Sequence, residues 1–326
     1  MQFIATEVLL IIELIIAFWI AISVGANDAT MASVVGSKFL GLTSAVIIGA
    51  IMDFLGATVL GYRVEETISR GLMNCKVTEF DALIAIVSVA VWLFVASCLG
   101  WPTSITNAVV GACIGLGLIK AGVQGVKWHT LSIIGIAWLL APLFGMLISV
   151  IFLKVILFIV YRTTKGLRDR VGAYYLVSFL LLFWSCIAAF SKGANDIANA
   201  TALLTLVYGN SLLLRTLCGI GMSIGLITIG RKVLRTVGLK LSALDPPSSL
   251  SVQLGVALTM LLGTLLKIPL SATQIMVISI IGVSRVRGTW ISMPNLKKVV
   301  LIWALTFPIT CALTMFLYYL VHLLLY

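Results

Sequence analysis

The sequence has few charged residues and few histidines. Only 10% of its 326 residues are charged, whereas 61% are hydrophobic, and the mean hydropathy is +1.18. Soluble domains usually carry about 25% charged residues, so this composition excludes a sizeable soluble domain. A helix that spans a membrane needs ~20 mainly apolar residues. The chain length therefore predicts an all-α, polytopic membrane protein with roughly ten spans.

The sequence also lacks the residue clusters of common membrane enzymes. It has two histidines, His129 and His322, and its six cysteines form no Cys-x-x-Cys pair and have no histidine at metal-ligand spacing. A Ser-His hydrolase or a zinc enzyme finds few of the residues it needs here. We predict that the protein is not an enzyme and uses no organic cofactor.

Basic residues outnumber acidic residues by 22 to 11, and they cluster between the apolar runs. Cytoplasmic loops of membrane proteins carry such an excess of basic residues. The positive net charge is explained in this way, so we expect no nucleic-acid partner. We predict a first transmembrane repeat at residues 1–160, a cytoplasmic central loop at 161–172 and a second repeat at 173–326. The protein would lie in the cell membrane with both termini extracytoplasmic.

The two halves of the sequence repeat each other. Gly25-Ala26-Asn27-Asp28 recurs as Gly193-Ala194-Asn195-Asp196, an offset of 168 residues. Trp101-Pro102-Thr103-Ser104-Ile105-Thr106 recurs as Ile268-Pro269-Leu270-Ser271-Ala272-Thr273, an offset of 167. Similarity of apolar helices explains a shared composition but not shared polar motifs. The matches therefore indicate an internal repeat.

Loop charge predicts that the two repeats are inverted. Segment 61–81 has a net charge of −1, whereas its counterpart 230–240 has a net charge of +4. Equivalent loops with opposite charge bias are expected on opposite sides of the membrane. We therefore predict two inverted repeats of about five membrane segments each, with discontinuous helices at the midplane.

The two Gly-Ala-Asn-Asp tetrads are the strongest sign of a binding site. An aspartate between apolar spans costs about 2.5–3.5 kcal/mol on insertion scales, and two occur in matching positions. Gly25 and Gly193 would permit helix breaks, whose free carbonyls, with the Asn and Asp oxygens, suit a hard cation. Half-helices over Ala29–Val35 and Ile197–Leu206 would offer N–H groups to an anion. The alternative is a pair of capped loops at the membrane surface.

The Pro-containing motifs offer donors instead of acceptors. Pro102 and Pro269 each precede a hydroxyl-rich turn that opens an apolar run. Such turns are often ordinary helix caps. Because they are duplicated, we expect their hydroxyl and N–H groups to bind a tetrahedral oxyanion, with the hydroxyls coming from Ser104, Thr106, Ser271 and Thr273.

These motifs resemble those of the inorganic phosphate transporter family, the PiT-type sodium-coupled phosphate carriers, which also includes sulfate permeases. The family's Gly-Ala-Asn-Asp-x-x-Asn signature is matched in full from Gly193 to Asn199, and its Pro-x-Ser-x-Thr segment at Pro102 and Pro269. Asp53-Phe54-x-Gly56-Ala57 resembles a stretch of the family's second span. The resemblance covers essentially the whole chain, without the long central loop of some members.

The resemblance implies secondary active import of inorganic phosphate, coupled to Na⁺, by alternating access. A sulfate permease of the same fold is the main alternative, and an ion channel is less favoured. The lipid bilayer is an expected partner, and a homodimer is the default oligomer. The implied substrate-binding residues are Ser104, Thr106, Asn107, Ser271, Thr273, Gln274, Asn27, Asn195 and Asn199. The implied metal-binding residues are Asp28, Asp196, Asn27 and Asn195.

The sequence departs from the family pattern at four positions. Met31 replaces the second Asn of the first signature, and Asn107 and Gln274 stand where many members have His. Lys192 stands where the second signature usually has His, and we expect it to extend outward rather than pair with a neighbouring aspartate. For Glu13 and Asp53, which lie within apolar runs, a transport role and a structural pairing remain open.

Overall fold

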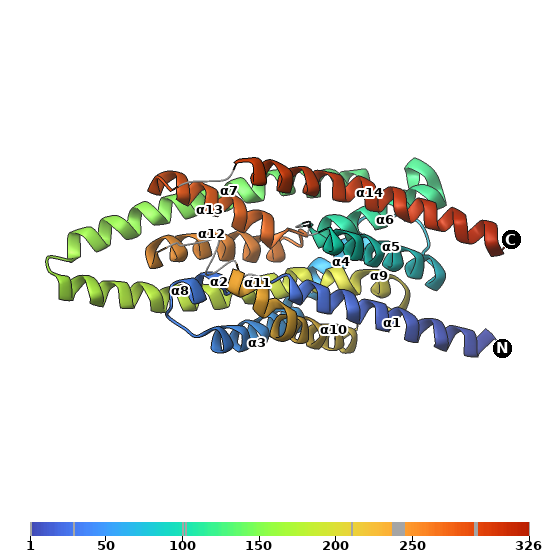
Figure 1. Ribbon diagram of the computed structural model, residues 1–326. Helices are drawn as coiled ribbons and strands as arrows, with labels where there is room; N and C mark the ends of the chain where they lie inside the picture. Colours follow the sequence, from blue (N-terminus) through green and yellow to red (C-terminus); the bar gives the residue numbers. More distant parts are fainter. Residues whose placement is uncertain are drawn as a thin grey trace.

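The computed structural model describes residues 2–28, 30–99, 101, 103–209, 211–236, 245–289 and 293–325. These residues form an elongated bundle of helices, and no β-sheet occurs among them (Figure 1). Nine helical segments of this part are long and apolar enough to cross a membrane. The predicted all-α polytopic architecture is confirmed. Roughly ten spans were expected, and the tenth apolar run of the sequence, at 268–283, corresponds to the helix Ala272–Arg287, which has only 16 residues.

The two halves contribute helices in the same order, so each helix of the second half is the repeat counterpart of the helix numbered seven lower. The first half has α1 (Gln2–Ala26), α2 (Ala32–Gly36), α3 (Leu42–Leu60), α4 (Tyr62–Arg70), α5 (Glu79–Cys98), α6 (Ile105–Ala121), a 3₁₀ turn (Gly122–Gly125) and α7 (Trp128–Thr163). The second half has α8 (Leu167–Asp196), α9 (Ala198–Tyr208), α10 (Leu212–Gly225), a π-helical turn (Leu226–Gly230), α11 (Arg231–Thr236), α12 (Pro246–Leu265), α13 (Ala272–Arg287) and α14 (Met293–Leu325).

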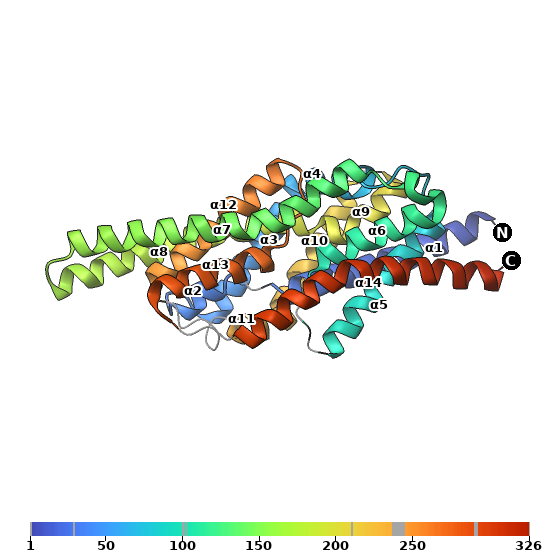
Figure 2. The same ribbon diagram turned by 90° about the horizontal axis from the view of Figure 1, so that it is seen from above.

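The halves are joined by a helical hairpin rather than by a long loop. The prediction of a loop at 161–172 is wrong in extent, because α7 continues to Thr163 and α8 starts at Leu167. Arg and Lys are good helix formers, and the Asp169 carboxylate accepts a hydrogen bond from Gly166 N at 3.2 Å, which closes the first turn of α8. In both views the hairpin tip lies at one end of the bundle and the two termini lie at the other (Figures 1 and 2).

Repeat counterparts run in opposite directions through the bundle. In Figure 1, α1 runs inward from the end that holds the termini, whereas α8 runs inward from the hairpin tip. The packing pairs follow the repeat as well: α1 packs on α10 and α8 on α3, α6 on α14 and α13 on α7, α4 on α9 and α11 on α2. Each pair joins one helix from each half. This arrangement suits inverted repeats, and the side of the membrane on which each end lies stays a prediction.

The tetrad glycines serve close packing. Gly25 is the second-last residue of α1, which ends at Ala26, whereas α8 continues past Gly193 to Asp196. A Cβ at Gly25 would lie 1.8 Å from Met222 O of α10, and one at Gly193 would lie 2.1 Å from Asp53 O of α3. The predicted break at Gly193 is therefore wrong, while Gly25 lies next to the end of α1; at both positions only glycine allows the two backbones to touch.

The opposing helices supply matching glycines. A Cβ at Gly56 of α3 would lie 1.9 Å from Phe190 O, and one at Gly225 of α10 would lie 2.0 Å from Ile22 O. The two crossings, α1 with α10 and α3 with α8, are thus built alike, with a glycine on each side. Helix α1 ends at Ala26 and α2 starts at Ala32, whereas Ile197, between α8 and α9, keeps helical backbone angles (φ −58°, ψ −34°).

We expect the Gly193→Ala variant to be destabilised by about 1–3 kcal/mol or more, because the added methyl group overlaps the α3 backbone. Unfolding of the purified protein in detergent, followed by heat and by denaturant, measures the loss. Gly135→Ala is the matched control, since a Cβ at this helical position meets nothing within 4 Å. Equal stability of the two variants would contradict the backbone contact.

Candidate functional site

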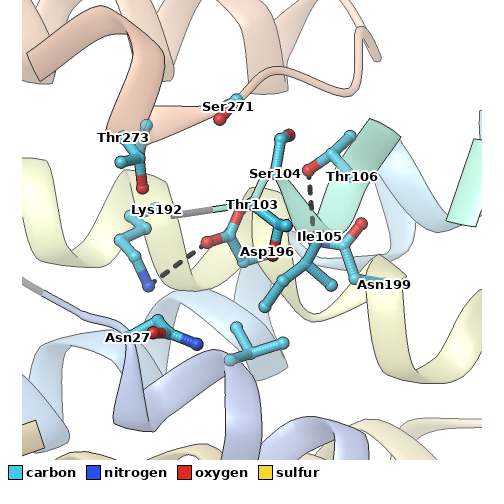
Figure 3. A pocket seen from close by; sticks show the side chains of 12 residues that line it. Asn27, Thr103, Ser104, Ile105, Thr106, Lys192, Asp196, Asn199, Ser271 and Thr273 are labelled. Atoms are coloured by element: carbon cyan, nitrogen blue, oxygen red, sulfur yellow. Dashed lines mark hydrogen bonds and ion pairs between the residues drawn. The ribbon is translucent and has the colours of Figure 1, made fainter. Parts of the chain in front are cut away.

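The duplicated motifs of both halves meet around one small polar cavity of about 30 Å³ (Figure 3). Its wall includes six of the predicted substrate-binding residues: Asn27, Ser104, Thr106, Asn199, Ser271 and Thr273. Thr103, together with Asp196 and Lys192 of α8, completes its polar lining. Residues as far apart in sequence as Asn27 and Thr273 thus lie together, which agrees with the placement expected from the repeat.

The hydroxyl groups lie where α6 and α13 begin. Ser104 is the N-cap of α6, and its Oγ accepts a hydrogen bond from Asn107 N at 3.4 Å. Ser271 is the N-cap of α13 and makes no side-chain capping bond, so its hydroxyl is available to the cavity. Free N–H groups at a helix start favour an anion. Pro102, which was expected to open the first of these turns, lies outside the described residues.

Hydrogen bonds tie these two helix starts to each other and to α9. Thr106 Oγ1 donates to Leu270 O at 3.3 Å, across the two halves. Asn199 Nδ2 donates to Thr106 Oγ1 at 3.2 Å, while the buried Asn199 Oδ1 has no partner among the described residues. The cavity wall therefore holds an acceptor whose bonding capacity is unused.

Three predicted substrate-binding residues do not line the cavity. Asn195 Oδ1 accepts from Leu270 N at 3.0 Å, and its Nδ2 donates to Ile268 O at 3.0 Å. Asn107 Nδ2 donates to Trp303 O at 3.3 Å, and Gln274 lies with Asn107 along a separate, mainly apolar groove. Buried backbone groups require partners, and the two Asn amides supply them. In this conformation these residues support the site instead of forming its surface.

Lys192 is buried between two carboxylates. Its Nζ lies 3.2 Å from Asp196 Oδ2 and 3.6 Å from Asp28 Oδ2, and its side chain is only 6% exposed. The expectation that Lys192 extends outward is wrong. Its i,i+4 spacing places Asp196 on the same helix face, and the segment that follows α1 brings Asp28 within reach, so two carboxylates offset part of the cost of burying the ammonium.

Asp28 is held by the turn that follows α1. Its Oδ1 accepts from Thr30 N at 2.6 Å and from Thr30 Oγ1 at 2.5 Å, and its Oδ2 faces Lys192 without making a hydrogen bond. Met31, where the signature would place Asn, is buried in an apolar cluster with α3. The first half therefore contributes a carboxylate but no amide at this position.

Asp53 of α3 is a further member of the cluster. It is fully buried, and neither carboxyl oxygen accepts a hydrogen bond from an N–H or hydroxyl group within the described part of the chain. It interacts with Asp28, Asp196 and Lys192, and its carboxyl group is within hydrogen-bond reach of that of Asp28. Three carboxyl groups thus share one ammonium in a buried cluster, where two adjacent carboxyls can hold one proton between them. Its position within an apolar run and the Asp-Phe-x-Gly-Ala resemblance were the only sequence signals.

Other buried acids have structural partners. Glu65 accepts hydrogen bonds from Arg215 Nη1 at 2.7 Å and Thr205 Oγ1 at 2.6 Å, which links α4 to α10 and α9. Glu13 Oε2 accepts from Tyr208 of α9 at 2.8 Å. Neither acid lines the cavity. For Glu13, where two roles were left open, the structure shows the structural pairing.

Comparison with known proteins identifies the class. Residues 24–314 match the sequence model of the phosphate transporter family. The chain belongs to this family. A predicted phosphate permease of Chlamydia pneumoniae is 30% identical, with 92% of this chain and 95% of that protein aligned. One of Thermococcus kodakarensis is 26% identical over 95% of this chain and 97% of its own. A solved structure called the sodium-dependent phosphate transporter is 28% identical, has a TM-score of 0.86, and matches 98% of this chain and 100% of its own.

Membership of this family confirms three predictions made from the sequence. The protein is a multi-pass membrane protein, it belongs to a family of transporters and not of enzymes, and phosphate is the substrate class of the family. The roles of individual residues in the cavity are predictions that rest on their geometry.

We expect Asn195→Ala to destabilise the protein by about 1–3 kcal/mol, because it leaves Leu270 N and Ile268 O buried without their partner. Denaturant unfolding measures the change. Asn74→Ala is the control: Asn74 is exposed, its long bond to Gln124 O spans 3.5 Å, and its loss should cost less than about 0.5 kcal/mol. An Asn195 variant as stable as the parent would show that the amide does not hold this segment.

Proposed function

We propose that the protein imports inorganic phosphate together with Na⁺ by alternating access. The observation that carries the proposal is the cavity itself, where hydroxyls at two helix starts adjoin a cluster of carboxylates. Hydroxyl and N–H donors suit a tetrahedral oxyanion, and carboxylate oxygens suit a hard cation. The similar solved structure, which is called a sodium-dependent phosphate transporter, supports this choice of anion and cation.

The cation side is supported by buried oxygens whose bonding capacity is not filled. Among the described residues Asn199 Oδ1 makes no hydrogen bond, Asp28 Oδ2 has the Lys192 ammonium 3.6 Å away, and Asp53 interacts with Asp28 and Lys192. Buried polar atoms are rarely left short of partners, and a Na⁺ would supply the missing interactions. Among the residues that the structure describes, no group of three or more His, Cys, Asp or Glu side chains has the arrangement of a metal site. Hydroxyl and carbonyl oxygens would therefore complete the Na⁺ coordination.

Coupling is required on electrical grounds. Bringing one negative charge into a cell at −100 mV costs about 2.3 kcal/mol, and a dianion costs about twice that. Na⁺ that enters with the anion offsets this cost. We place the carrier in the cell membrane, with the α7–α8 tip cytoplasmic and both termini outside, and we take a homodimer as its default state.

Alternating access is supported by a difference between the halves. Asn195 bonds to the segment before α13, whereas its counterpart Asn27 is exposed and its Nδ2 donates to Ser23 O of α1, at 3.0 Å. In an inverted repeat, the two halves exchange conformations when the site changes sides. We infer that Asn27 would bond the segment before α6 in the opposite state.

Sulfate is the second candidate substrate. The specific observation in its favour is that neither of the two histidines lines the cavity, which holds hydroxyls, amides, one lysine and one aspartate. Sulfate is a dianion without a protonated oxygen, so its site needs no side chain that recognises one. Counterflow of labelled phosphate and sulfate in proteoliposomes, with and without a Na⁺ gradient, decides between them. Faster exchange of sulfate than of phosphate would reverse our choice.

Ser271→Ala should weaken phosphate binding by about 1–3 kcal/mol, because it removes a donor without removing a helix-capping bond. Titration calorimetry on the purified protein measures the affinity. Ser132→Ala is the control, since the Ser132 hydroxyl bonds within α7, to Trp128 O. If Ser271→Ala bound phosphate and sulfate as the parent does, Ser271 would be only a helix cap.

Asp28→Asn and Asp196→Asn should insert normally but lose Na⁺-driven uptake, because each keeps its size and loses its charge. We expect a fall of at least ~10-fold for each, and a greater one for Asp28→Asn, because Met31 offers that half no amide oxygen. Uptake against Na⁺ concentration in liposomes is the measurement. Asp81→Asn, which breaks the distant pair with Lys120, is the control. Parental Na⁺ dependence in both variants would refute a role in coupling.

A further inference from the structure

Lys192 breaks the two-fold symmetry of the site. Ser104 and Ser271, Thr106 and Thr273, and Asp28 and Asp196 are repeat-related pairs, but the counterpart of Lys192 is Val24, which lines the same cavity. The repeat therefore supplies two sets of anion-binding hydroxyls and one fixed ammonium. A single lysine at this place is a property of the present chain that the duplicated motifs do not explain.

The ammonium lies where a mobile cation would be bound. It is within 3.2 Å of Asp196 and 3.6 Å of Asp28, one carboxylate from each half, and it also interacts with Asp53. At the same time Lys192 lines the cavity beside Ser271 and Thr273, and Figure 3 shows its Nζ turned toward Asp196 and Asn27. One group thus contacts both the carboxylate cluster and the space for the anion.

We propose that Lys192 is a resident cation of the transport site, which takes the position between Asp28 and Asp196 that a co-transported Na⁺ would otherwise occupy and binds the phosphate directly. This inference rests on the proposed function. The lysine balances one of three carboxylates, so mobile cations balance at most the remaining two. Because it is covalently held, it returns with the empty carrier and brings no charge into the cell.

The first test removes the charge. Phosphate affinity is measured against Na⁺ concentration, with choline replacing Na⁺, for the parent and for Lys192→Gln. At low Na⁺ the variant should bind phosphate about 10- to 100-fold more weakly. Na⁺ should restore its affinity, so the slope of log affinity against log Na⁺ concentration rises by about one. Lys120→Gln, which removes a partly buried lysine paired with Asp81 away from the cavity, should keep the parental slope.

A parental slope and affinity in Lys192→Gln overturn the proposal. The second test needs no variant: the ratio of ²²Na⁺ to ³²P taken up by the parent should be two or less, and a ratio of three overturns it. If the parent binds neither phosphate nor sulfate, the proposed function fails by itself. The proposal for Lys192 is then tested by the rise in unfolding temperature that Na⁺ causes. This rise should be larger for Lys192→Gln than for the parent, and an equal rise overturns the proposal of a resident cation.

Discussion

Charge balance inside a dry bundle is the constraint on which the site depends. Asp28, Asp53 and Asp196 come from three helical regions and share the ammonium of Lys192. Unpaired buried charges cost several kcal/mol each, so the Lys192 ammonium offsets repulsion among the three acids. The segment after α1 is therefore held beside α8 by the same groups that the site uses.

The rest of the cavity follows from where helices start and stop. Helices α6 and α13 begin beside each other, and their N-terminal hydroxyls meet the end of α8 and the start of α9. The site thus has donors on one side and carboxylates on the other, with Lys192 between them. Such an arrangement lets an anion and a cation stabilise each other while both are out of water.

Much of this arrangement could be predicted from duplicated polar motifs, because polar groups in apolar sequence must find partners or ligands. Which partner each group finds depends on tertiary packing. The sequence indicates that a glycine is needed at position 193, but glycine suits a helix break and a close backbone contact equally, so the sequence does not distinguish them. The direction of Lys192 depends on where α1 ends relative to α8, and the roles of Asn195 and Asn107 depend on carbonyls that no motif reveals. The helical ends at Thr163 and Leu167 were hidden by charged residues that suit helices and loops alike.

The glycine crossings have a mechanical consequence. Where Gly25 meets Met222 and Gly193 meets Asp53, backbone touches backbone, and no layer of side chains is available to rotate or slip. Each crossing therefore behaves as a rigid contact between two helices. Because these contacts fix α1 to α10 and α3 to α8, each joins one half of the chain to the other. A rearrangement that keeps the two crossings cannot rotate one half against the other, so each of its rigid bodies must contain helices from the two halves.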